Sequence, residues 1–117
     1  MYQVYGIKNC DTVKKALKWL GENGIEYEFH DYKSKGISEK YLKNWISQIG
    51  WEPLVNKKGM TWRQLDPETQ AGIKNEKAAI KLMIEKTSVI KRPLIESSGK
   101  IVALGFDEAE YGKRFEV

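Results

Sequence analysis

The pattern of apolar and polar positions alternates between two periods along the chain, which predicts strands followed by helices. Residues 2–7 have a short apolar strand pattern, and the apolar positions over 13–20 recur at the spacing of one helix face that ends at Asn23-Gly24. Residues 25–30 then alternate apolar and polar side chains, as a half-buried strand does. A strand, a helix and a second strand parallel to the first make one βαβ unit.

The middle of the chain has the start and stop signals of several helices. Ser38 is the predicted N-cap of a helix that Gly50 ends, and Asp66-Pro67 combines a cap with a proline at the first helical position. Asn75 is the predicted cap of a further helix. Residues 56–63 indicate a loop that leads into a short helical turn. The middle is therefore expected to be helical.

The last third returns to strand patterns. Residues 88–96 are rich in β-branched and apolar side chains, residues 97–100 fit a hairpin turn, and residues 101–104 form the returning strand. A terminal helix is expected over residues 107–115. This order predicts a β-β-α end to the chain.

Length and element order together predict an α/β fold in one domain. A chain of 117 residues has the size of a single domain, and its 41% hydrophobic content is enough for a core. We expect residues 1–117 to form one domain in which the β-α-β start and the β-β-α end share a mixed sheet. A helical insertion over roughly 36–86 is expected to separate the two.

Composition excludes several classes of function. No apolar run reaches the length of a membrane-spanning helix, and the N-terminus lacks the charged region and cleavage site of a secretory signal. With one cysteine there is no intrachain disulfide and no multi-cysteine metal site, so we expect a cytoplasmic protein without a membrane partner. The net charge of +4 suits an anionic small ligand or an acidic partner. Nucleic acid is a disfavoured partner, because the lysines are mixed with acidic residues.

Cys10 is the only cysteine, and it lies where the first predicted strand gives way to the first helix. A thiol at a helix start faces unpaired backbone N–H groups and the positive end of the helix dipole, which lower its pKa and make the sulfur a nucleophile. Lys8 adds positive potential nearby. The alternative is a cysteine that packs as a small apolar side chain. The polar neighbours Asn9 and Asp11 favour the reactive role.

Two further features have two interpretations each. Asp11 or Thr12 caps the first helix, or the Thr12 hydroxyl donates to the Cys10 sulfur, and capping is favoured. Pro93 follows Arg92 inside an apolar strand pattern, although proline cannot donate to a strand ladder. Either the Arg92-Pro93 bond is cis and displays Arg92 at the end of the sheet, or the segment is an edge strand with a trans proline.

Two common kinds of site have no pattern in this sequence. The acidic residues lack the spacing of metal ligands, and residues 6–10 lack the glycines of a phosphate loop. The single histidine, His30, lies in an alternating strand pattern, where a structural role is favoured over that of a base. We therefore expect no metal and no nucleotide cofactor.

Three segments together resemble those of the arsenate-reductase-like (ArsC/Spx) family. They are Tyr5-Gly6-Ile7-Lys8-Asn9-Cys10-Asp11-Thr12, Trp62-Arg63-Gln64-Leu65 and Ile90-Lys91-Arg92-Pro93-Leu94-Ile95. The resemblance spans nearly the whole chain, and its nearest branch is that of the YffB-type small thiol reductases. It implies a thioredoxin-like fold with a helical insertion, and a cis bond at Pro93 beside the active cysteine.

The resemblance also implies roles for single residues. Cys10 matches the nucleophilic cysteine, and Arg92 matches an arginine that binds an oxyanion or stabilises the thiolate. The loop with Lys57 and Lys58 falls where arsenate reductases have another active-site arginine. A lysine there would be a substitute that lacks the bidentate fork of a guanidinium. Arg63 either lines the cleft from the insertion or is a solvated helix residue.

Two departures from the family pattern bear on function. Gly105 stands where glutaredoxin-linked arsenate reductases have a further arginine, which weakens the case for arsenate as the substrate. Val13 stands where the Spx regulators have the second cysteine of a Cys-x-x-Cys pair, which excludes an intramolecular disulfide switch.

The favoured hypothesis is a glutathione-dependent monothiol reductase, in which an external thiol resolves the mixed disulfide on Cys10. Arg92, Lys8 and the Lys57-Lys58 loop are expected to receive the glutathione carboxylates. An arsenate reductase that works with glutaredoxin is the second hypothesis. An Spx-like regulator that binds RNA polymerase is the third.

Overall fold

The computed structural model describes every residue from 1 to 117 and divides into two compact units. The sheet unit comprises Met1–Lys35 and Arg92–Val117, and the helical unit comprises Gly36–Lys91. The expectation of one domain with an insertion over residues 36–86 stays a prediction.

The sheet unit is built on a mixed four-stranded sheet in the order β2-β1-β3-β4. Its first two strands are parallel, and the other two pairings are antiparallel, as the predicted β-α-β and β-β-α segments require. The elements in chain order are β1 (Tyr2–Gly6), α1 (Asp11–Glu22), β2 (Tyr27–Asp31), α2 (Tyr32–Lys35), β3 (Leu94–Ser97), β4 (Lys100–Leu104) and α7 (Glu108–Arg114).

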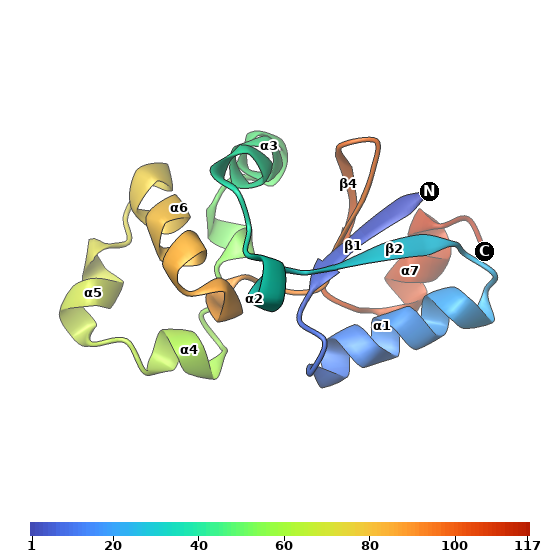
Figure 1. Ribbon diagram of the computed structural model, residues 1–117, viewed down its shortest axis with the longest axis horizontal. Helices are drawn as coiled ribbons and strands as arrows, with labels where there is room; N and C mark the ends of the chain where they lie inside the picture. The colour runs from blue at the N-terminus through green and yellow to red at the C-terminus, as the bar shows by residue number, and fades with distance from the viewer. The chain divides into compact units, whose positions relative to one another are not determined.

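Helices α1 and α7 cover one face of this sheet (Figure 1). The helix face predicted over residues 13–20 supplies much of the buried surface, because its apolar side chains point at the sheet. The buried residues of this core are Val4, Ala16, Trp19, Leu20, Ile95, Ala103, Tyr111 and Phe115. The sheet unit therefore has its own hydrophobic core.

The opposite face of the sheet carries polar side chains near its centre. The Tyr5 hydroxyl donates a 2.9 Å hydrogen bond to the Glu96 carboxylate, and Glu96 is only 5% exposed. The half-buried His30 ring lies edge-on to Tyr5, with their centroids 5.2 Å apart. The structural role that the strand pattern favoured for His30 stays a prediction.

Strand register brings three chain segments to one edge of the sheet. Gly6 at the end of β1 pairs with Asp31 at the end of β2, and Tyr5 pairs with Leu94 at the start of β3. Because β1 and β2 are parallel and β3 is antiparallel to β1, the chain leaves β1 and β2 and enters β3 at the same edge. Cys10, Tyr32 and Arg92 lie on these three segments.

The prediction of a strand over residues 88–96 is wrong for the first half of that segment. A 3₁₀ turn, η2, occupies Thr87–Val89, and β3 begins only at Leu94. Pro93 has no N–H to donate to a ladder, so regular pairing starts after it. The predicted hairpin turn is confirmed, with Ser98 at φ 50° and Gly99 at φ 81° between β3 and β4.

The helical unit contains the helices that the cap signals predicted. Ser38 accepts from the Tyr41 N–H at 3.5 Å, Asp66 from the Thr69 N–H at 2.7 Å, and Asn75 from the Ala78 N–H at 2.9 Å; these caps precede α3, α5 and α6. The elements are α3 (Glu39–Ile49), η1 (Glu52–Leu54), α4 (Met60–Arg63), α5 (Pro67–Gly72), α6 (Glu76–Glu85) and η2 (Thr87–Val89). None of the helices in the chain combines the length and apolar composition needed to cross a membrane.

Candidate active site

Cys10 is itself the N-cap residue of α1. Its backbone is extended at φ −146° and ψ 122°, and its side chain is half-buried. The expectation that Asp11 or Thr12 caps the helix is wrong, because both lie inside the first turn and Cys10 precedes it. The thiol occupies the place of a capping oxygen and makes no capping hydrogen bond of ordinary length. The sulfur therefore lies at the unpaired N–H groups of the helix start.

Arg92 approaches this sulfur from the segment before β3. The Arg92 Nε donates to the Cys10 Sγ across 3.4 Å, although 82 residues separate them in sequence. The Arg92-Pro93 bond is cis, which resolves the two interpretations of this proline. The buried Pro93 is tied to the end of β4, since its carbonyl accepts from the Gly105 N–H at 2.8 Å.

The surroundings of Cys10 lower the pKa of its thiol. Partial burial is the largest single influence and raises the pKa, because it disfavours the charged thiolate. The Val13 N–H, the hydrogen bond and positive charge of Arg92, and the Thr12 N–H all lower the pKa, and together they outweigh burial. The pKa of Cys10 is therefore lowered, as its position at a helix start predicted, and the Arg92 guanidinium also contributes to this lowering.

Tyr32 is a further residue at this edge of the sheet, and the sequence did not single it out. It begins α2 directly after β2, is fully buried, and is hydrogen-bonded to the Arg92 side chain. Burial raises the pKa of Tyr32, so its hydroxyl stays protonated. The signal that could have found it is its position, because side chains just beyond the carboxyl ends of parallel strands gather at one edge.

The other predicted site residues are exposed. Lys8 lies in the loop between β1 and α1, and Thr12 contributes its backbone N–H to the site. Lys57, Lys58 and Arg63 belong to the helical unit, where the Lys57 ammonium lies 5.3 Å from the centroid of the Trp62 ring. Their roles in binding stay predictions.

Comparison with known proteins places this geometry in a family. The model of the ArsC family matches residues 5–114, which include Cys10, Tyr32 and Arg92. The chain belongs to the ArsC family. Its mixed sheet and flanking helices are those of the thioredoxin-like structures of that family.

Several relatives of this ArsC-family chain extend over nearly its full length. An uncharacterized protein of Haemophilus influenzae is 45% identical and covers 98% of this chain and 99% of its own. Spx 2 of Bacillus anthracis, a global transcriptional regulator, is 26% identical over 97% of this chain and 86% of its own.

Two solved structures are similar in both fold and sequence. That of a YffB protein has a TM-score of 0.89 and 42% identity, covering 97% of this chain and 98% of its own. An arsenate reductase (ArsC) related protein from Brucella melitensis has a TM-score of 0.79 and 40% identity, covering 99% of this chain and 95% of its own.

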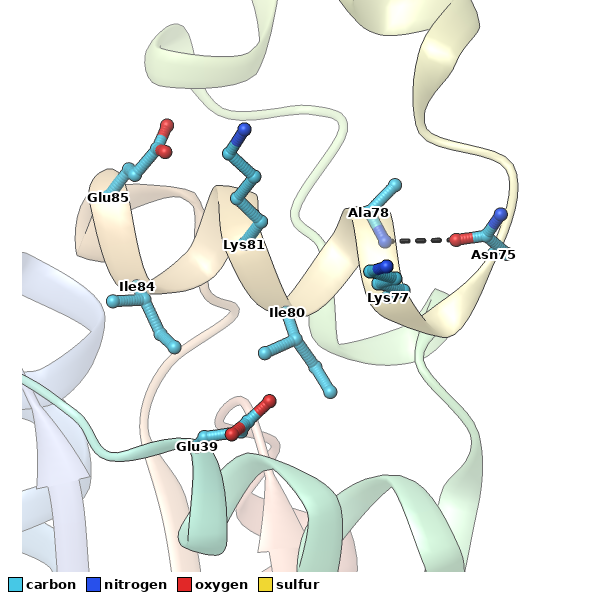
Figure 2. A pocket seen from close by; sticks show the side chains of 8 residues that line it. All are labelled: Glu39, Asn75, Lys77, Ala78, Ile80, Lys81, Ile84 and Glu85. Carbon is cyan, nitrogen blue, oxygen red and sulfur yellow. Dashed lines mark hydrogen bonds between the residues drawn. The ribbon is translucent and has the colours of Figure 1, made fainter.

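The helical unit of this ArsC-family chain has a separate hollow between α3 and α6. Figure 2 shows Ile80 and Ile84 pointing toward Glu39, while Lys81 and Glu85 point the other way. Its lining residues are Glu39, Asn75, Lys77, Ala78, Ile80, Lys81, Ile84 and Glu85. Its lining includes no cysteine, serine, threonine or histidine, whereas the thiol with a lowered pKa, Cys10, belongs to the sheet unit.

The lowered pKa of Cys10 predicts a pH-dependent contribution to stability. Because the pKa is lower in the folded protein than in the unfolded chain, the thiolate adds stability that is complete above the unfolded value of about 8.5. That stability is lost as the pH falls through the folded value. The reference is Cys10→Ser, in which serine is a good N-cap that does not ionise. The free energy of unfolding of the wild type, minus that of Cys10→Ser, should rise from about pH 5 to about pH 9.

Urea denaturation of the two proteins across this range measures that difference. A difference in the free energy of unfolding that stays constant, or that falls as the pH rises, would contradict the lowered pKa.

Proposed function

We propose that this chain is a glutathione-dependent monothiol reductase with Cys10 as its nucleophile. The observation that carries the proposal is the Cys10 sulfur at a helix start, with the Arg92 Nε 3.4 Å away and a lowered thiol pKa. A thiolate at neutral pH attacks disulfides, whereas a thiol does not. Since Cys10 is the only cysteine, no second thiol of the chain can complete the exchange.

The proposed reaction has two exchange steps on one sulfur. The Cys10 thiolate attacks the glutathione sulfur of a mixed disulfide, the S–S bond breaks, and the substrate leaves as a thiolate that takes up a proton. The thiolate of a second glutathione then attacks the Cys10–glutathione disulfide. Oxidised glutathione leaves, and Cys10 returns to the thiolate. The net reaction converts the mixed disulfide and one reduced glutathione into the reduced substrate thiol and oxidised glutathione.

Arg92 has two proposed roles in this cycle. Its charge favours the Cys10 thiolate before attack and after release. Its remaining donors suit a carboxylate of glutathione, with exposed lysines such as Lys8 as further partners. We place the reaction in the cytoplasm, where glutathione keeps thiols reduced.

Mass spectrometry after incubation with oxidised glutathione tests this function. We expect one glutathione on the wild-type chain, none on Cys10→Ser, and loss of the adduct when reduced glutathione is added. A coupled assay with a glutathione mixed disulfide should show turnover that depends on Cys10. If Cys10 alkylates rapidly but forms no adduct, or if its pKa is at or above about 8.5, the proposal is wrong.

Arsenate reduction is a second candidate, because a 40% identical solved structure is described as arsenate reductase related. The site argues against it at one position. Gly105 has φ 81°, a backbone conformation that disfavours an arginine. Its N–H donates a hydrogen bond to the carbonyl of Pro93, the residue after Arg92. Arg92 therefore has no second guanidinium partner from that position. Steady-state arsenate turnover with glutathione and glutaredoxin would reverse the order of the two candidates.

A regulator that docks on RNA polymerase is a third candidate, supported by the similarity to Spx 2. Its prediction is distinct, because docking needs no reactive sulfur. A complex between purified RNA polymerase and this chain that survives Cys10→Ser, together with no glutathione adduct, would favour it. The chain differs from a disulfide-switched regulator at Val13, so such docking would not respond to an intrachain disulfide.

A further inference from the structure

Three side chains from separate segments meet beyond one edge of the sheet. Tyr32 follows β2, Cys10 follows β1, and Arg92 precedes β3. The register Gly6↔Asp31 and Tyr5↔Leu94 sets these segments side by side, so their proximity follows from strand pairing. Tyr32 is 0% exposed, whereas Cys10 and Arg92 are half-buried. The tyrosine therefore lies on the interior side of the group.

The direction of each hydrogen bond follows from the chemistry of arginine. A guanidinium has five N–H donors and no acceptor, so Arg92 must donate to both of its partners. Its Nε donates to the Cys10 Sγ at 3.4 Å, and the Tyr32 hydroxyl oxygen accepts from the same side chain. The guanidinium is thereby held between a sulfur on its exposed side and a buried phenol.

We propose that Tyr32 is a positioning residue, whose hydroxyl holds the Arg92 guanidinium in the orientation that directs Nε at the Cys10 sulfur. Arginine has a long side chain with large rotamer freedom, and a single weak bond to sulfur orients it poorly. A second acceptor on a rigid, buried ring removes part of that freedom. The proposal deepens the proposed function, because the thiolate that Arg92 stabilises is the nucleophile of that reaction.

A neutral acceptor suits this position better than a charged one. A carboxylate in place of the hydroxyl would also orient the guanidinium, but its charge would offset the positive potential that Cys10 receives. The charged and titratable groups that act on Tyr32 are Arg92, Cys10 and Asp31, and its hydroxyl stays protonated among them. Tyr32 thus orients Arg92 while leaving its charge for the sulfur.

The pH profile of Cys10 alkylation by iodoacetamide in Tyr32→Phe tests the proposal. Loss of the hydroxyl should move the midpoint upward and lower the alkylation rate at about pH 6 by about threefold, because one oriented hydrogen bond to the thiolate weakens. Tyr111→Phe is the matched control. It also removes a buried phenol hydroxyl of the sheet unit, which donates to the Gly105 carbonyl, and it should leave the midpoint unchanged.

A double variant separates a positioning role from a general loss of packing. In Arg92→Gln, the further change Tyr32→Phe should not move the profile, because the group that Tyr32 orients is gone. An unchanged profile in Tyr32→Phe alone, or equal shifts in the presence and absence of Arg92, overturns the proposal.

The outcomes for Tyr32 and for the proposed function can be told apart. A lowered wild-type midpoint with no effect of Tyr32→Phe overturns the positioning role alone. A shifted profile in Tyr32→Phe, with no glutathione adduct on the wild type, overturns the reductase alone and supports the positioning role.

Discussion

Replacing Arg92 with glutamine is expected to raise the pKa of Cys10 by about one unit and to slow its alkylation near pH 6 about tenfold. The side chain of Arg92 provides both a hydrogen bond and a positive charge to the sulfur, and glutamine retains only an amide donor. The Val13 and Thr12 N–H groups remain, so part of the lowering should persist. Alkylation rates measured from about pH 5 to about pH 10 give the midpoint.

Arg92→Lys separates the effect of the positive charge on the Cys10 pKa from the effect of the guanidinium hydrogen bond. Lysine keeps the charge but lacks the forked donors, so its midpoint should fall between those of wild type and Arg92→Gln. Arg114→Gln is a matched control, because Arg114 is the other arginine of the sheet unit and pairs with Glu110 at the surface. A wild-type profile in Arg92→Gln would show that the helix start alone sets the pKa.

Replacing Leu20 with alanine is expected to reduce the free energy of unfolding by about 2–5 kcal/mol. Leu20 is 0% exposed on α1 and lies in the core between that helix and the sheet. The substitution removes apolar contacts and leaves a cavity in close-packed surroundings. Urea or thermal denaturation measures the loss.

Lys18→Ala is the control for this core substitution, because Lys18 is exposed on the same helix. Its effect should stay within about 0.5 kcal/mol. At temperatures where Leu20→Ala is folded, its Cys10 alkylation profile should match that of the wild type, since Leu20 is not among the groups that shift the Cys10 pKa. A loss below about 1 kcal/mol would mean that the core collapses around the alanine.

The predicted helix starts at Ser38, Asp66 and Asn75 are correct, because a capping oxygen accepts from an N–H only three residues later. The same local reasoning was wrong at Asp11 and Thr12. It assumed that an oxygen would cap α1, whereas the chain places the sulfur of Cys10 there. Sulfur is a weaker hydrogen-bond acceptor than oxygen. The N–H groups at the start of α1 therefore remain available to stabilise the Cys10 thiolate.

The sequence predicted some residues of the candidate site and missed others. The local sequence indicated Cys10, since its position before a helix follows from neighbouring residues alone. Residue patterns left the Arg92-Pro93 bond open between cis and trans, and only the family resemblance favoured cis. The only signal for Tyr32 was its position just after a predicted strand, because its hydrogen-bond partner Arg92 lies 60 residues later in the sequence.

By itself the sequence determined the periodicity of α1, the caps of the helical unit, the hairpin after β3 and a thiol at a helix start. These depend on contacts within a few residues, so composition and spacing are enough to predict them. Only the tertiary structure decided that β3 begins after Pro93, that Arg92 donates to Cys10 and that Tyr32 is bonded to Arg92. Those contacts depend on strand order and register, which bring segments together that are distant in the sequence. The two partners of each contact do not lie in the same short stretch of sequence, so local patterns cannot predict them.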